Sequence, residues 1–118
     1  MSASYTVAVL GGGSFGTVIA NIIAGNGNRV RLWLRNAELA AAINQERQNI
    51  TYLPGYLLHD GLVATTDLEE AVAGVDILFV AVPSASFRDV VREVALHVSV
   101  ETLVISLTKG IESGGFRL

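Results

Sequence analysis

Five short runs of continuous or alternating apolar residues divide the chain, and segments with a helical spacing of apolar residues separate them. The runs are Tyr5–Leu10, Arg29–Leu34, Val63–Thr65, Asp76–Val82 and Thr102–Leu107. Short runs rich in β-branched residues are typical of strands. After its first residue, Asp76–Val82 is apolar on both faces, which indicates a strand inside a parallel sheet.

The segments between these runs predict four helices. The first begins near Ser14, and Gly25 and Gly27 are expected to end it. Asn36 and Asp67 are predicted to cap the second and third helices, because their short side chains accept hydrogen bonds from the first free amides. The fourth helix is expected to open with a capping-box-like pair. This pair is Ser86 and Asp89.

Strands that alternate with helices predict right-handed crossovers and a parallel sheet covered on both sides. We therefore expect a doubly wound α/β fold of the Rossmann type. The length of 118 residues fits one domain. No sixth strand is visible, so residues 1–118 are expected to form a single, truncated domain.

Composition narrows the functional classes. Hydrophobic residues make up 51% of the chain and charged residues 16%, against about 25% charged in an average protein. A chain this apolar is not disordered, and one face is expected to meet a partner or a further segment. The net charge is −3 and no basic run occurs, which argues against nucleic-acid binding.

Disulfides and thiolate metal sites are excluded because the chain has no cysteine. No signal peptide is recognisable, and the longest apolar run is far too short to span a membrane. We expect a soluble, cytoplasmic protein that has no membrane partner. The two histidines, His59 and His97, are far apart in the sequence and are expected to be a surface and a structural residue.

The strongest motif is GGGSFG at residues 11–16, which matches G-x-G-x-x-G between a predicted strand and a predicted helix. Gly11 permits a tight turn, Gly13 lets a pyrophosphate approach the backbone, and Gly16 lets the helix pack closely. The amides at the helix start then attract the anion. Ser14 is expected to donate its hydroxyl to a phosphate, to cap the helix, or both. The alternative is a glycine-rich connection without a ligand.

The end of the second strand bears on the choice of cofactor. NAD-binding domains usually place an acid there for the ribose 2′-hydroxyl. This chain instead has Arg35 followed by Asn36, and a guanidinium suits a 2′-phosphate. The sequence therefore favours NADP over NAD, or tolerance of both. Alternatively, Arg35 is a solvated surface residue.

Two further residues follow the carboxyl ends of strands, where ligands bind in such folds. Phe87 lies one turn after Val82-Pro83-Ser84 and is expected either to rest against the dinucleotide or to belong to the core. Lys109 follows the fifth strand and would bind the cofactor or a substrate phosphate, unless it is an ordinary exposed lysine. No Ser–His–Asp group can be assembled.

Several segments together resemble the N-terminal part of bacterial-type NAD(P)-dependent glycerol-3-phosphate dehydrogenase. They are GGGSFGT (11–17), WLRN (33–36), NITYLPG (49–55), VPSASFR (82–88) and SLTKGIE (106–112). The glycine motif is generic, whereas YLPG, VPS-x-x-FR and TKGIE at these separations are specific. The TKGIE and YLPG pieces argue against a 6-phosphogluconate or ketopantoate dehydrogenase.

The resemblance implies an oxidoreductase that interconverts dihydroxyacetone phosphate and sn-glycerol 3-phosphate for phospholipid synthesis. By motif match, Ser14, Phe15 and Arg35 would contact the cofactor, and Lys109 would reach both cofactor and substrate phosphate. Phe15 stands where the family often has Trp or Tyr. A homodimer is compatible with the sequence.

Family members are much longer, and their C-terminal helical domain carries the catalytic lysine. No catalytic residue is therefore assigned to this chain, which is expected to be a fragment that binds cofactor without turnover. The other interpretation is a dinucleotide-binding module that is not catalytic at all.

Overall fold

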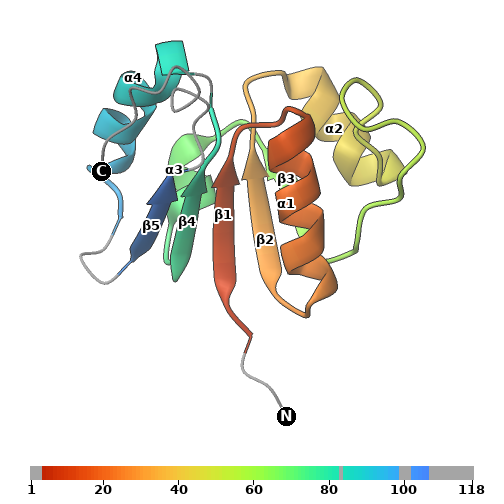
Figure 1. The fold of residues 1–118 in the computed structure, drawn as a ribbon, viewed down its shortest axis with the longest axis horizontal. Helices are drawn as coiled ribbons and strands as arrows, with labels where there is room; N and C mark the ends of the chain where they lie inside the picture. The colour runs from red at the N-terminus through yellow and green to blue at the C-terminus, as the bar shows by residue number, and fades with distance from the viewer. Residues whose placement is uncertain (1–3, 83, 99–101, 107–118) are drawn as a thin grey trace, which may run out of the picture.

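The computed structural model describes residues 4–82, 84–98 and 102–106 (Figure 1). Its strands are β1 (Thr6–Leu10), β2 (Arg29–Trp33), β3 (Leu62–Thr65), β4 (Ile77–Val80) and β5 (Leu103–Ser106). Its helices are α1 (Ser14–Gly25), α2 (Ala37–Glu46), α3 (Leu68–Val72) and α4 (Ser84–Val94). Each predicted run coincides with one of the strands, although β3 begins at Leu62, one residue before the predicted run Val63–Thr65, and the alternating pattern is confirmed.

The five strands form one sheet in the order β3-β2-β1-β4-β5, and all neighbouring pairs are parallel. The strand order reverses between β1 and β4, which is where ligands bind in open α/β sheets. Leu10 lies opposite both Trp33 and Val80. The chain therefore leaves β1, β2 and β4 at the same edge, and the doubly wound fold is confirmed.

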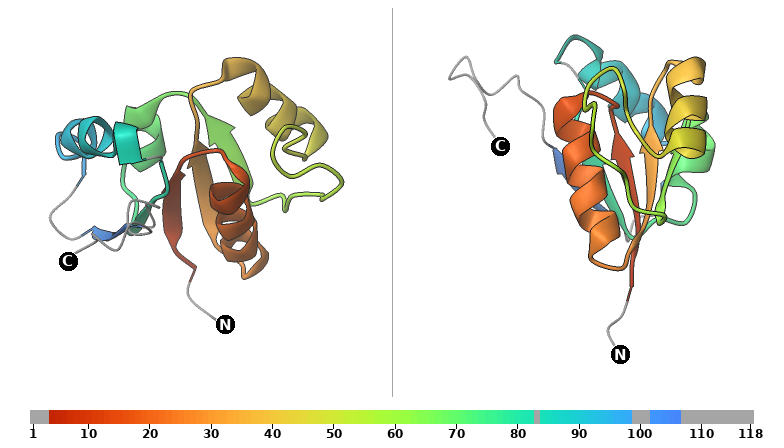
Figure 2. Two further views of the ribbon diagram at one scale, coloured as in Figure 1. Left: turned by 45° about the horizontal axis from the view of Figure 1, so that its top comes forward. Right: turned by 90° about the vertical axis from the view of Figure 1, so that its right-hand side faces the viewer.

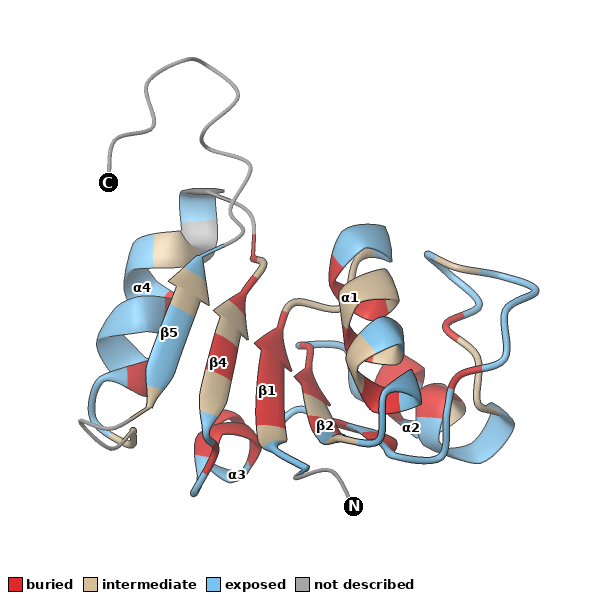
Figure 3. Cartoon of the chain, turned by 60° about the horizontal axis from the view of Figure 1, so that its bottom comes forward, coloured by how far each residue is buried: buried red, intermediate tan, exposed pale blue. Residues whose placement is uncertain are grey.

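Alternation along β1 divides the core into two layers. Val7 and Val9 belong to the cluster that includes residues of α1 and α2, whereas Ala8 and Leu10 belong to the cluster of α3 and α4. Figure 2 shows α1 and α3 on opposite faces of the sheet. The central strands are buried and β5 is mostly exposed (Figure 3). The glycine turn therefore follows β1, the central and most buried strand of the sheet.

The predicted caps of α2 and α3 are confirmed. The Asn36 side chain accepts a hydrogen bond from the Leu39 amide at 3.0 Å, and Asp67 accepts one from the Glu70 amide at 3.3 Å. The capping-box prediction for α4 is wrong, because this helix begins at Ser84. Ser86 is thus the third residue of the helix and does not precede its first turn.

The segment between α2 and β3 is irregular, as predicted, but long-range hydrogen bonds hold it in place. Arg47 adopts a left-handed conformation at the end of α2, with φ of 58°. Its guanidinium donates to the carbonyls of His59 and Leu62, and its own carbonyl accepts from the Leu58 amide at 2.7 Å. Leu58 is buried, so this loop packs against the domain rather than extending away from it.

Candidate functional site

The glycine turn joins β1 to α1 at the shared carboxyl edge of the sheet. The Gly11 amide donates to the Trp33 carbonyl at 2.8 Å, and Gly11 has a φ of 125°. A Cβ at this position would lie 2.6 Å from the carbonyl oxygen of Ala81. Only glycine combines this backbone angle with so close a neighbour.

Gly16 allows the first turn of α1 to pack directly on the turn that precedes it. A Cβ on Gly16 would collide with the carbonyl oxygen of Gly11, which is rigid backbone. Gly13, by contrast, has nothing within 4 Å of the place where its Cβ would be. Two of the glycines are thus required by packing, while the third opens onto free space.

The N-terminus of α1 faces this free space. Gly13 is the N-cap residue and provides no side-chain cap. The first hydrogen bond of the helix runs from the Thr17 amide to the Gly13 carbonyl, at 2.9 Å. The amides of Ser14, Phe15 and Gly16 meet no acceptor among the described residues. Such a helix end carries partial positive charge and free donors, which suit an anion.

The side chains at this helix end differ in their surroundings. Ser14 is the first helical residue and not the cap, and its hydroxyl donates to the Tyr52 carbonyl at 2.9 Å. The capping role considered for Ser14 is therefore wrong. Phe15 is 51% exposed next to it, and its ring is available to a ligand that reaches the turn.

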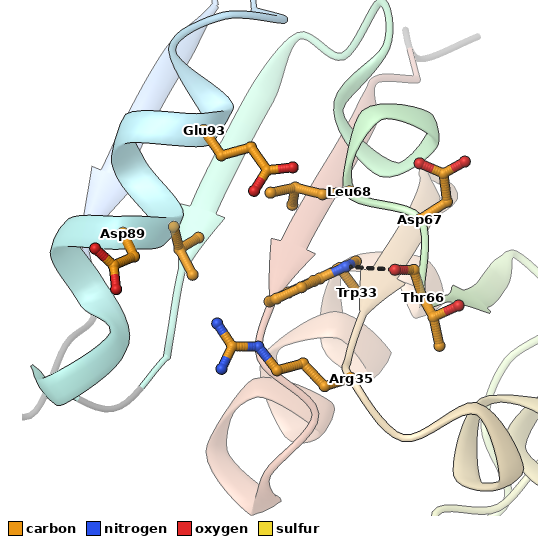
Figure 4. Close-up of a pocket in the computed structure, with 8 residues that line it drawn as sticks. Trp33, Arg35, Thr66, Asp67, Leu68, Asp89 and Glu93 are labelled. Carbon is orange, nitrogen blue, oxygen red and sulfur yellow. Dashed lines mark hydrogen bonds between the residues drawn. The ribbon is translucent and has the colours of Figure 1, made fainter.

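A pocket of about 360 Å³ lies beside the end of β2 (Figure 4). Its lining consists of Trp33, Arg35, Thr66, Asp67, Leu68, Asp89, Val90 and Glu93. The Arg35 guanidinium carbon is 5.5 Å from the centre of the Trp33 ring, and the indole nitrogen of Trp33 donates to the Thr66 carbonyl at 3.0 Å. The pocket is therefore lined by one cation, Arg35, by three acidic residues and by one aromatic ring.

Neither Phe87 nor either histidine lines this pocket. Phe87 is half-buried and packs against the core cluster of α3 and α4. Lys109 falls outside the described residues. His59 is exposed and His97 is half-buried. Within the part of the chain that the structure describes, no group of three His, Asp or Glu side chains could hold a metal ion, and no helix is long and apolar enough to cross a membrane.

Comparison with known proteins decides the family. Residues 6–118 match the family model described as the N-terminus of NAD-dependent glycerol-3-phosphate dehydrogenase. The chain belongs to this family. The resemblance inferred from its sequence segments is thereby confirmed.

Curated relatives of this family match along the whole chain. The glycerol-3-phosphate dehydrogenases of Saccharophagus degradans and Teredinibacter turnerae are 57% and 52% identical over 118 residues, which is 100% of this chain. The same match covers 33% and 35% of those relatives. The chain therefore spans about a third of the length of the curated relatives that it matches.

Solved structures agree with this assignment. Glycerol-3-phosphate dehydrogenase from Coxiella burnetii superimposes with a TM-score of 0.84 at 32% identity, over 90% of this chain and 33% of that one. The yeast enzyme from Saccharomyces cerevisiae gives 0.83 at 32% identity, over 91% and 34%. Arogenate dehydrogenase from Synechocystis, at 16% identity and a TM-score of 0.69 over 86% of this chain and 32% of that one, shares the fold alone.

Two contacts of the NITYLPG segment (49–55) were not predicted from the sequence. Asn49 is fully buried and binds the glycine turn, and the Tyr52 carbonyl accepts from Ser14. Neither residue follows a periodic pattern, and an asparagine before a proline-containing turn ordinarily indicates only a bend. The contacts join residues that are 37 and 38 positions apart in the sequence, and periodicity does not detect contacts over such a separation.

Proposed function

We propose that this chain is the cofactor-binding part of an NAD(P)-dependent glycerol-3-phosphate dehydrogenase, with residues 1–118 acting as one binding unit. The whole enzyme would interconvert dihydroxyacetone phosphate and sn-glycerol 3-phosphate by hydride transfer. Family membership and the uncapped start of α1 behind the glycine turn support the proposal. The free helix amides carry the most weight, because they are donors without acceptors beside open space.

A dinucleotide fits the residues that are present. Its pyrophosphate would lie over Gly13, held by the amides of Ser14 and Phe15, while Gly11 and Gly16 keep the turn close to the sheet. The nicotinamide would supply the hydride once bound. The contribution of this chain is to hold and orient the dinucleotide, and to meet its negative charge with fixed backbone dipoles.

The pocket beside β2 would receive the adenosine end of the cofactor. Trp33 offers an apolar, partly aromatic wall, and the exposed Arg35 guanidinium can reach a 2′-phosphate. Asp89 and Glu93 oppose a phosphate in the same pocket. We therefore propose that NADP is preferred but that NAD is also accepted, with Arg35 responsible for the difference.

Two further contacts belong to this proposal. Phe87 stands one turn into α4, at the edge where β4 ends, and would rest against the dinucleotide with the part of its ring that is not buried. Lys109 would reach both the cofactor and the substrate phosphate, as its match to the family's TKGIE segment implies.

Replacing Arg35 by alanine is expected to weaken NADPH binding about tenfold while changing NADH binding less than twofold. The lost contact is a charged hydrogen bond at an exposed site, and a tenfold change corresponds to about 1.4 kcal/mol. Isothermal titration calorimetry with both cofactors measures the effect. Arg29→Ala, an exposed arginine at the opposite end of β2, is the matched control. Equal weakening of both cofactors by Arg35→Ala would remove the assigned role.

The function itself is tested by separating binding from turnover. We expect this chain to bind NADPH in a calorimetric titration but to oxidise none of it when dihydroxyacetone phosphate is added. The reason is that no general acid or base is assigned within residues 1–118. Failure to bind either cofactor would contradict the proposal, and rapid NADPH oxidation would contradict the division of labour between binding and catalysis.

A further inference from the structure

A fully buried amide side chain, that of Asn49, forms a hydrogen bond with the glycine turn and so braces it. Asn49 lies in the irregular segment after α2, yet it is 0% exposed. Its Nδ2 donates to the Gly12 carbonyl and to the Thr17 hydroxyl, both at 2.8 Å. Its Oδ1 accepts from the Tyr52 amide at 3.1 Å. A buried amide is costly unless its hydrogen-bonding groups are satisfied, and here both donors and the acceptor are used.

Thr17 completes the brace from within α1. Its side chain is also 0% exposed, and its hydroxyl donates to the Gly12 carbonyl at 3.3 Å. The Gly12 oxygen therefore receives hydrogen bonds from two buried side chains that come from different elements. No other carbonyl of the turn accepts from two side chains among the described residues.

The orientation of one peptide plane follows from this arrangement. The Gly12 carbonyl and the Gly13 amide belong to the same planar, trans peptide unit, so they point in opposite directions. Two partners that hold the carbonyl inward thus direct the Gly13 amide outward, away from Asn49 and Thr17. A peptide between two glycines rotates more freely than any other, so it needs such a restraint.

We propose that Asn49 is a positioning residue for the cofactor, because it locks the Gly12–Gly13 peptide with its amide directed at the pyrophosphate. Asn49 does not touch the cofactor itself. The inference rests on the proposed function, since it assumes that a diphosphate binds over Gly13. It adds to that function a residue outside the glycine motif on which the geometry of the motif depends.

The surrounding segment keeps Asn49 in place. The Leu53 amide donates to the Asn49 carbonyl at 2.8 Å, and the Tyr52 carbonyl accepts from the Ser14 hydroxyl at 2.9 Å. The segment from Asn49 to Leu53 is therefore hydrogen-bonded both to Gly12 in the turn and to Ser14 at the start of α1. The first two YLPG residues, Tyr52 and Leu53, thus both donate their amides to Asn49.

The test compares ligands that have and lack a diphosphate. We expect Asn49→Ala to weaken binding of NADH and ADP about tenfold, measured by calorimetry well below the unfolding temperature, while adenosine affinity stays within twofold. A general loosening of the fold would lower all three affinities together. Unchanged NADH affinity in the folded variant, or an equal loss for adenosine, would overturn the proposal.

Asn44→Ala is the matched control. Asn44 also bridges backbone groups through its amide, donating to the Ala64 carbonyl at 2.9 Å and accepting from the Ala64 amide at 2.8 Å. Asn44 belongs to α2, and its side chain binds the edge strand β3 and makes no hydrogen bond to the glycine turn. We expect this variant to be less stable but to keep the wild-type ratio of ADP to adenosine affinity.

Thr17→Val decides the matter if Asn49→Ala does not fold. It preserves the shape of the side chain, removes one hydrogen bond to the Gly12 oxygen and leaves Asn49 one acceptor short. The expected result is a smaller loss of ADP affinity in the same direction, with adenosine unaffected, and no change in the ratio would count against the brace. If the wild-type protein bound no NADH, the proposed function and not the brace would have failed.

Discussion

Gly16→Ala is expected to destabilise the domain by about 3 kcal/mol and to abolish cofactor binding. The new methyl group would collide with the carbonyl oxygen of Gly11, so α1 would have to move away from the sheet. The Gly11 oxygen is backbone and the position of a Cβ is fixed by the backbone, so no rotamer change relieves the contact. Urea denaturation followed by circular dichroism measures the loss in the free energy of unfolding.

Gly25→Ala provides the control on the same helix. A Cβ there would meet only the ring of His59, 2.8 Å from its Nε2, and an exposed side chain can turn aside. Its effect on unfolding is expected to be within about 1 kcal/mol, because alanine also favours the helix. Equal stability of Gly16→Ala and the wild-type protein would show that the close approach of helix and turn is not required.

Gly13→Ala is expected to lower the free energy of unfolding by no more than about 1 kcal/mol, the cost of a poorer helix cap, and to weaken dinucleotide binding on the order of a hundredfold. Gly13 has a φ of −75° and nothing within 4 Å of its missing Cβ, so alanine fits the protein alone. The methyl group would occupy the space into which the pyrophosphate is proposed to descend. Calorimetric titration with NADPH, together with a thermal melt, separates the two effects.

The opposite pattern would be equally informative. If Gly13→Ala bound NADPH as tightly as the wild-type protein, no phosphate could lie over this residue. Taken together, Gly13→Ala and Gly16→Ala distinguish a glycine that a ligand needs from one that the fold needs.

Sequence reasoning recovered the features of this domain that depend on local order. The GGGSFG turn lies between a strand and a helix as predicted, and Asn36 and Asp67 cap helices where expected. With Ser86 as its cap, α4 would begin at Phe87, three residues after its actual first residue, Ser84. Helix ends are poorly defined by local sequence, because the path of the chain after β4 also decides where the first turn forms.

The features that sequence reasoning missed depend on contacts between distant segments. Asn49 reaches Gly12 across 37 residues, and no periodicity marks a polar side chain that becomes buried inside a loop. The acidic lining of the pocket likewise combines Asp67, which precedes α3, with Asp89 and Glu93 from α4. Of these charged residues only Arg35 follows the end of β2 directly in the sequence, so the carboxylates that oppose a 2′-phosphate were not predicted.

The free amides at the start of α1 are proposed to receive the pyrophosphate. A titration of the ¹⁵N-labelled protein with NADPH, monitored by its amide chemical shifts, tests this proposal residue by residue. We expect the amide signals of Gly13, Ser14 and Phe15 to move furthest, because new charged acceptors reach their hydrogens. If these signals stayed in place while those of another surface shifted, the cofactor would bind elsewhere and the proposed pyrophosphate site would be wrong.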